Sequence, residues 1–296
     1  MSLLVACPLL ALATSSPALQ PERLGSEDLE AALARRTDGC THVFVDAGSN
    51  IGMHARFLFE PTVYPNSTFV RVFDRFFGPS PRDNSRICAV EFEPNPRFKQ
   101  RYERLTAAYA DQGWRVIHAP YAVSDDAGGG LTFYRNDAGG ANQDWGFGVV
   151  NHNGTASEAI NVSSIDFSRF LLALNERQPY SGDAPSARRT VVKMDIEGAE
   201  FFTLPHAINS GALCTGVDYL SAEFHEFLAR HTPLSFPDHG VELPTQQAAE
   251  TLRDSLRRTI RGLPAHCRLH NVDNMDDEAY LNDRSHAQLE APSVRA

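Results

Sequence analysis

The chain has no long cluster of basic residues and no C-x-x-C pair. Its 27 Lys and Arg face 37 Asp and Glu, so the formal net charge at pH 7 is −10. Nucleic-acid phosphates would be repelled over most of such a surface, and we expect no nucleic-acid partner. The missing C-x-x-C pair leaves a zinc-ribbon or thioredoxin-type site without support.

Long apolar runs are also missing. The apolar start of the chain is too short for a typical membrane span, so no stable membrane span is expected. Residues 1–20 have the apolar core and the small-residue Ala-Leu-Ala exit of a leader peptide, without the usual preceding basic residues. Sequons at Asn66, Asn153 and Asn161 fit a secretory route. The sequence favours neither a secretory nor a cytoplasmic location.

Cysteines are few. Removal of a leader containing Cys7 would leave an even set that allows three disulfide pairings. This set is Cys40, Cys88, Cys214 and Cys267. Four reduced thiols in the core are the favoured interpretation.

The 42% of apolar residues suffices for a sizeable core. We expect a single domain over 21–285 and a polar tail over 286–296. Loops are expected near 60–86, 136–157 and 176–189. Strands are predicted at about 42–46, 87–92, 116–118, 190–196 and 217–224. Their alternation with helices predicts an α/β fold with a doubly wound, mostly parallel sheet and helices on both faces.

A glycine-containing turn follows the first predicted strand, in Val43-Phe-Val-Asp-Ala-Gly-Ser-Asn-Ile-Gly52. The apolar run ends at Asp46, and Gly48, Asn50 and Gly52 form the turn before a helix. Nucleotide-binding α/β domains begin in this way, because small residues let the backbone approach a ligand and helix N–H groups point at it. We expect these four residues to contact a cofactor.

The second strand ends with two acids, Glu91 and Glu93, which share a strand face. An acid at this position commonly binds ribose hydroxyls, and Glu93 is the candidate because it lies nearest the break at Pro94. It follows Asp46 by 47 residues, against about 20 between turn and acid in the dinucleotide fingerprint. The 60–86 insertion would explain the difference.

Three segments together resemble a known family. Asp-x-Gly-x-Asn-x-Gly, Glu-Pro-Asn-Pro and Lys-Met-Asp-Ile-Glu-Gly-Ala-Glu occur in the order seen in FkbM-type S-adenosylmethionine-dependent methyltransferases. The resemblance runs from Val43 to His225. It implies a Rossmann-like methyltransferase sheet, with Asp46, Gly48, Asn50 and Gly52 around the methionine part of S-adenosylmethionine and Glu93 on its ribose. Ser49 stands where the family often has Ala.

Candidate catalytic residues follow the fourth and fifth predicted strands. Because alternate residues of a strand point to the same face, Lys193 and Asp195 share one face of the fourth strand. Glu223 and His225 likewise share a face at the end of the fifth. His225 would titrate near neutrality and is the proposed general base for a hydroxyl acceptor. Asp195 is the second choice and would help to hold the acceptor or the cofactor amine.

No metal is expected at this site. Asp195, Glu197, Glu223 and His225 could act together as ligands, but hard-ligand spacing over two strands is unspecific. Glu197 and Glu200 are also typical of acids in the first turn of a helix. Trp145 and Phe147 would serve equally well as a substrate lid or as anchors of their own loop.

The leading hypothesis is O-methylation of a small-molecule or glycan hydroxyl. A nicotinamide-dependent oxidoreductase is disfavoured, because the turn lacks the third glycine spacing of G-x-G-x-x-G and no Tyr-x-x-x-Lys pair stands out. A catalytically silent secreted binding domain on the same fold is the third alternative. The oligomeric state and the acceptor cannot be read from the sequence.

Overall fold

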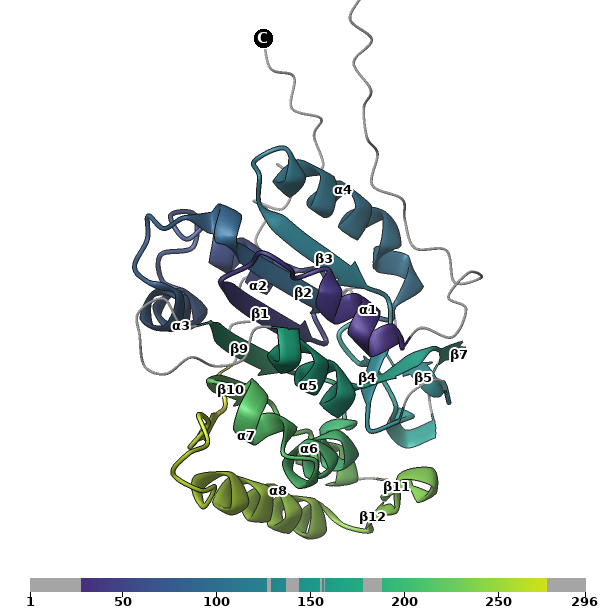
Figure 1. The fold of residues 1–296 in the computed structure, drawn as a ribbon. Coiled ribbons are helices and arrows are strands. Elements are labelled where there is room, and N and C mark those ends of the chain that lie inside the picture. Colours follow the sequence, from purple (N-terminus) through teal and green to yellow (C-terminus); the bar gives the residue numbers. More distant parts are fainter. Residues whose placement is uncertain are drawn as a thin grey trace, which may run out of the picture.

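A six-stranded, wholly parallel sheet forms the centre of the protein in a computed structural model (Figure 1). The structure describes residues 28–126, 129–136, 144–154, 156, 158–177, 188–230 and 232–275. The sheet order is β13-β10-β9-β1-β2-β3. The strands are β1 (His42–Ala47), β2 (Ile87–Phe92), β3 (Arg115–Ala119), β9 (Arg189–Met194), β10 (Tyr219–Ala222) and β13 (Val272–Asp273). The predicted leader 1–20 and tail 286–296 lie outside the described residues.

The chain winds outward from the middle of the sheet in both directions. It passes from β1 through β2 to β3, returns beside β1 as β9, and continues through β10 to β13. The order therefore reverses between β1 and β9, which is where ligands bind in open α/β sheets, above the carboxyl ends of the strands. The predicted α/β class and parallel sheet are confirmed, and the arrangement is compatible with a Rossmann-like fold.

Helices cover both faces of the sheet and form two hydrophobic clusters. One face packs against α1 (Leu29–Arg35), α5 (Phe167–Arg177), α6 (Glu200–Asn209), α7 (Ala212–Gly216) and α8 (Gln246–Arg261). The other packs against α2 (Met53–Phe59), α3 (Thr68–Phe77) and α4 (Lys99–Ala110). Alternate residues of β1 separate the faces, because Val43 and Val45 join the first cluster and Phe44 joins the second.

The segment 60–86 is not the inserted loop that its prolines suggested. Its apolar centre forms the ten-residue helix α3, and a short 3-10 helix, η2 (Asn84–Arg86), leads into β2. Phe69, Phe73 and Phe77 lie on one buried face of α3 at helical spacing. Phe73 meets Phe44 of β1 edge to face, with ring centroids 4.9 Å apart. The segment is thus part of the core.

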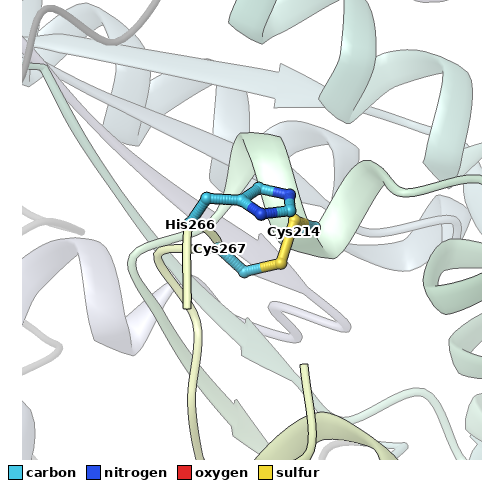
Figure 2. A group of neighbouring side chains, drawn as sticks. All are labelled: Cys214, His266 and Cys267. Atoms are coloured by element: carbon cyan, nitrogen blue, oxygen red, sulfur yellow. A yellow bond between two sulfur atoms is a disulfide. The ribbon is translucent and has the colours of Figure 1, made fainter. Parts of the chain in front are cut away.

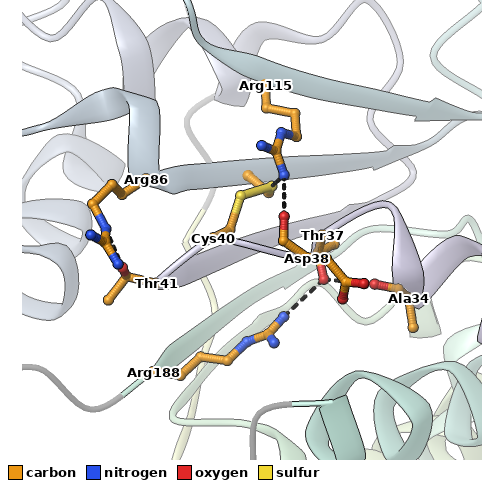
Figure 3. The surroundings of a disulfide bond; sticks show 9 residues. Ala34, Thr37, Asp38, Cys40, Thr41, Arg86, Arg115 and Arg188 are labelled. Carbon is orange, nitrogen blue, oxygen red and sulfur yellow. Dashed lines mark hydrogen bonds between the residues drawn. A yellow bond between two sulfur atoms is a disulfide. The ribbon is translucent and has the colours of Figure 1, made fainter.

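Two disulfides replace the four reduced thiols that were expected. Cys40 pairs with Cys88, because Cys40 precedes β1 and Cys88 lies in the neighbouring β2, with Cα atoms 5.9 Å apart. Arg115 lies over this bond and donates to the backbone oxygen of Asp38 at 2.6 Å (Figure 3). Cys214 of α7 pairs with Cys267, beside the imidazole of His266 (Figure 2).

Three small sheets sit beside the main one. β4 (Ala122–Ser124) pairs with β8 (Ser164–Asp166), and β11 (Leu234–Phe236) with β12 (Val241–Leu243). Residues after 130 form an antiparallel sheet of β5 (Leu131–Arg135), β6 (Phe147–Gly148) and β7 (Glu158–Val162). Asn161, the acceptor of one sequon, lies in β7. Of the helices described, none has the length and apolarity to cross a membrane.

Candidate functional site

A cavity opens above the carboxyl ends of β1, β2 and β9, where the chain order reverses. Of the predicted site residues, Gly48, Asn50, Glu93 and Asp195 line it. The remaining lining residues are Phe92, Pro94, Tyr121, Ala122, Val123, Phe133, Asp144, Trp145, Phe147, Ile196 and Glu197. The enclosed space measures about 40 Å³, enough for a few water molecules at ~10–15 Å³ each. A larger ligand would have to displace part of this lining.

The glycine turn crosses closely over the end of β9. Gly48 has a φ of +78°, and a Cβ placed there would overlap the backbone oxygen of Asp195. Only glycine tolerates both conditions. The N–H groups of Gly48 and Ser49 donate to the Phe92 oxygen, at 3.0 and 3.1 Å. These two turn amides are therefore bound by β2.

Glu93 joins the turn to the end of β2. Its Oε2 accepts the N–H of Asn50 at 2.7 Å, and its Oε1 accepts the N–H of Asn95 at 2.8 Å. Burial raises the pKa of Glu93 to about 8, although these two donors act in the opposite direction. The carboxyl group lies at the cavity wall with both oxygens oriented by backbone amides, and the ribose-binding role of Glu93 stays a prediction.

Asp46 and Gly52 do not belong to the cavity lining. Asp46 is fully buried beneath the turn, 3.5 Å from Lys193 Nζ and 3.3 Å from His54 Nδ1. Gly52 precedes α2 in the left-handed conformation and packs against Leu105. Both residues thus lie outside the cavity lining, unlike Gly48 and Asn50.

Four side chains meet where β9 and β10 end. His225 Nε2 lies 3.4 Å from Asp195 Oδ1 and 3.5 Å from Glu197 Oε1. On the other side of the ring, Glu200 Oε1 lies 3.2 Å from Nδ1 and accepts the backbone N–H of His225 at 2.7 Å. The structure therefore brings both predicted catalytic residues together. Glu223 is not part of this group.

The expectation that His225 titrates near neutrality is wrong. The imidazole is 3% exposed, and although burial acts to lower its pKa, Glu197 and Glu200 raise it well above the ordinary value. The strand-parity argument also fails here, because β10 ends at Ala222 and Glu200 orients the ring instead.

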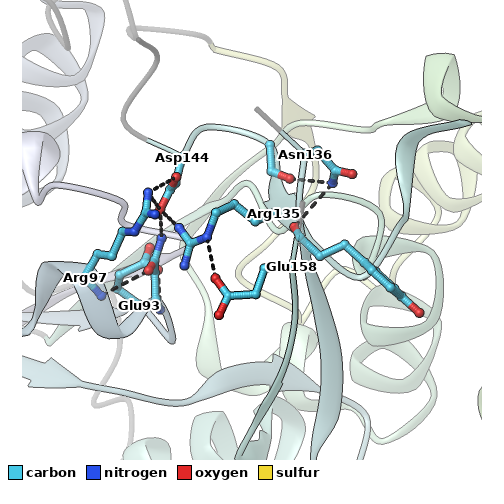
Figure 4. Close-up of polar contacts among 9 residues, drawn as sticks. Glu93, Arg97, Arg135, Asn136, Asp144 and Glu158 are labelled. Carbon is cyan, nitrogen blue, oxygen red and sulfur yellow. Dashed lines mark hydrogen bonds and ion pairs between the residues drawn. The ribbon is translucent and has the colours of Figure 1, made fainter. Parts of the chain in front are cut away.

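Asp144 closes the cavity on the side of the small antiparallel sheet (Figure 4). It is 3% exposed, pairs with Arg135, accepts from Arg97 at 2.9 Å and accepts from the Asn95 side chain at 2.9 Å. Next to it, Trp145 lines the cavity and Phe147 packs against Phe133. Phe147 is thus an anchor of its segment, and Trp145 forms part of the cavity wall.

Three non-glycine residues of the described chain have positive φ angles, and all three line the cavity. They are Asn50 at 47°, Asp144 at 56° and Glu197 at 52°. Such backbone costs on the order of 1–3 kcal/mol and concentrates at functional sites. Asn50 was recognisable from its glycine turn and Glu197 from its Glu-Gly pair. No local pattern marks Asp144.

Comparisons with known proteins add no family or relative. No family model, no curated protein and no solved structure matches the chain at a significant level.

Proposed function

We propose that this protein is an S-adenosylmethionine-dependent methyltransferase with a Rossmann-like sheet, acting on a hydroxyl group of a small molecule or glycan. The observation that carries the proposal is the set of carboxyl groups on the cavity wall. Glu93, Asp144, Asp195 and Glu197 line the cavity, and no Lys or Arg of the described chain does. This wall suits a ligand that carries a sulfonium and an amine, because opposite charges attract in a poorly solvated site.

The same wall argues against a dinucleotide. A nicotinamide cofactor would bring a pyrophosphate to the glycine turn, where free amides normally receive it. Here the amides of Gly48, Ser49 and Asn50 are bound within the protein. The acidic lining would repel the phosphates as well. The oxidoreductase alternative therefore has no support from the geometry.

The residues fit the parts of S-adenosylmethionine in separate ways. Glu93 would accept hydrogen bonds from the ribose hydroxyls, and Asp195 would pair with the amine. Trp145 would offer a donor, because its buried Nε1–H has no acceptor among the described residues. When bound, the cofactor supplies an electrophilic methyl group. The chain would then orient the acceptor oxygen behind that methyl group, an effect worth up to ~7–11 kcal/mol.

Entry of the cofactor requires a movement, because the enclosed cavity is small. The segment from Asp144 to Phe147 is a part of the wall that lies outside the main sheet. Its outward shift would break the contacts of Asp144 with Arg97 and Asn95. We expect cofactor binding to be accompanied by this opening.

A thermal-shift experiment tests the proposal. S-adenosylmethionine and S-adenosylhomocysteine should raise the Tm and NAD should not, because a ligand that binds only the native state stabilises it. At pH 9, above the raised pKa of Glu93, calorimetry should show Glu93→Gln weakening S-adenosylmethionine binding about 10–150-fold, through the loss of charge-assisted hydrogen bonds. Glu91→Gln is the matched control, since Glu91 lies two residues earlier on the same face and outside the cavity lining.

Two outcomes would overturn the proposal. One is an unchanged Tm with either sulfur compound at millimolar concentration, which would leave the silent binding domain as the better hypothesis. The other is a Tm raised by NAD alone, which would restore the oxidoreductase.

A further inference from the structure

We infer that Asp195, Glu197 and His225 form a binding site for one divalent transition-metal ion, although the sequence alone led us to expect none. One oxygen of each carboxylate and one imidazole nitrogen lie within 4.8 Å of one another. The two oxygens are 3.4 and 3.5 Å from His225 Nε2. Ligand atoms about 2.0–2.2 Å from a shared ion lie about 3.0–3.5 Å from one another at tetrahedral or octahedral angles.

The orientation of His225 supports the same conclusion. Metal-ligating histidines usually donate their second ring N–H to a carboxylate, which fixes the tautomer and directs the other nitrogen to the ion. Glu200 provides this carboxylate, since its Oε1 lies 3.2 Å from Nδ1 and is fully buried. Glu200 also accepts the backbone N–H groups of His225 and Gly198. The ring is therefore held with Nε2 toward Asp195 and Glu197.

Charge favours a cation at this position. Three carboxylates surround one imidazole, and the nearby Lys193 is shared between Asp195, at 3.2 Å, and Asp46, at 3.5 Å. The group therefore holds more negative than positive charge in a largely buried position. A divalent ion would compensate this excess without any change of backbone.

The donor set indicates the class of metal. Two carboxylates and one imidazole suit Mn²⁺, Fe²⁺ or Zn²⁺ better than Ca²⁺ or Mg²⁺, which prefer oxygen ligands alone. Three protein ligands leave coordination positions open, and Asp195 and Glu197 both face the cavity. A hydroxyl compound in the cavity could occupy an open position. Only this last role, as the acceptor site, rests on the proposed function.

A second group of metal-ligand types in the described chain does not compete. Cys214, His266 and Cys267 lie together, but the two sulfur atoms are joined in a disulfide and offer no thiolates (Figure 2). A carboxylate–imidazole pair outside the metal-ligand groups of the described chain provides a control. Asp125 Oδ1 lies 2.6 Å from His239 Nδ1, away from the Asp195 group and outside the cavity lining.

Electron paramagnetic resonance of Mn²⁺ tests the site without any cofactor or acceptor. The chelator-treated full-length protein should remove the signal of free Mn²⁺ with a stoichiometry of one ion per chain. Glu197→Gln should weaken this binding more than about 100-fold, since loss of an outer-shell partner alone typically costs 10–100-fold. Asp125→Asn should bind like the wild type, and Ca²⁺ should displace Mn²⁺ only in large excess.

The inference is overturned if the wild type leaves Mn²⁺ free at millimolar concentration. It is also overturned if Glu197→Gln binds as tightly as the wild type, or if Asp125→Asn abolishes binding. His225→Ala gives a second measurement, and its thermal unfolding shows whether it is folded. The thermal shift with S-adenosylmethionine is a separate readout, so failure of the metal site and failure of the proposed function are distinguishable.

Discussion

The two halves of the sheet's carboxyl edge accommodate their acidic side chains in different ways. Above β1 and β2, Glu93 is held by the backbone N–H groups of Asn50 and Asn95. Above β9 and β10, Asp195, Glu197 and Glu200 converge on the imidazole of His225. Backbone amides satisfy a carboxylate without adding charge, whereas three acids around one imidazole leave an excess of negative charge. The first half thus suits a polyhydroxy ligand and the second a cation.

Gly48 follows β1 and approaches the backbone of Asp195 after β9, so it lies between the two halves. Its substitution should lower the free energy of unfolding most. Gly48→Ala would force a Cβ into the Asp195 backbone oxygen at a positive φ, and should destabilise the protein by about 3–5 kcal/mol. Chemical denaturation measures this. Gly39→Ala is the matched control, because Gly39 has a φ of +83° with nothing within 4 Å of a Cβ. It should cost about 1–2 kcal/mol. Equal losses of stability in the two variants would mean that the close approach of Gly48 to the Asp195 backbone is unimportant.

Asp144 lies over the β1–β2 half. Its replacement by a neutral residue should lower the free energy of unfolding by an intermediate amount. Asp144→Asn would leave the buried guanidinium of Arg135 without its closest carboxylate, at a cost of about 2–3 kcal/mol. Glu158→Gln removes the exposed acid on the other side of Arg135 and should cost less than about 1 kcal/mol. Urea unfolding of both variants checks the difference. An Asp144→Asn protein as stable as the wild type would contradict the closing role of Asp144.

The smallest expected effect is a pH dependence of the free energy of unfolding that comes from Glu93, at the end of β2. Because the pKa of Glu93 is raised from 4.5 to about 8 in the folded protein, its stabilising contribution is present at low pH and lost as pH rises toward 8. From pH 5 to pH 7 the wild type should lose about 2 kcal/mol relative to Glu93→Gln. Paired unfolding curves at the two values measure this. If the difference in unfolding free energy between the two proteins does not change with pH, the hydrogen bonds from Asn50 and Asn95 offset the effect of burial on the pKa of Glu93.

The strands and the glycine turn could be predicted because their signals are local. β1 and β2 appeared as apolar runs at the right positions, and the turn between β1 and α2 was marked by Gly48 and Gly52. Segment 60–86 was misjudged because prolines and glycines at its ends hid the helical spacing of Phe69, Phe73 and Phe77. The two disulfides could not be derived, because spacing along the chain does not specify which strands become neighbours.

The candidate site was predictable only in part. Asp195, Gly48, Asn50 and Glu93 were identified from strand ends and do line the cavity. Asp46 was assigned to the cofactor because it ends an apolar run, yet Lys193 and His54 hold it beneath the turn. Contacts with neighbouring elements decide which of these residues face the cavity and which lie beneath the turn, and no local sequence pattern encodes such contacts.

The sequence by itself determined the class of fold and the edge of the sheet where the candidate site lies, since hydrophobic periodicity and turn residues act over a few positions. Only the tertiary structure decided which side chains meet there. Asp144 reaches Arg97 and Asn95, and Glu200 turns His225 toward Asp195 and Glu197. These contacts join segments 25 to 49 residues apart in the chain. Their geometry depends on strand order and helix packing, and it fixes the charge and the ligand preferences of the site.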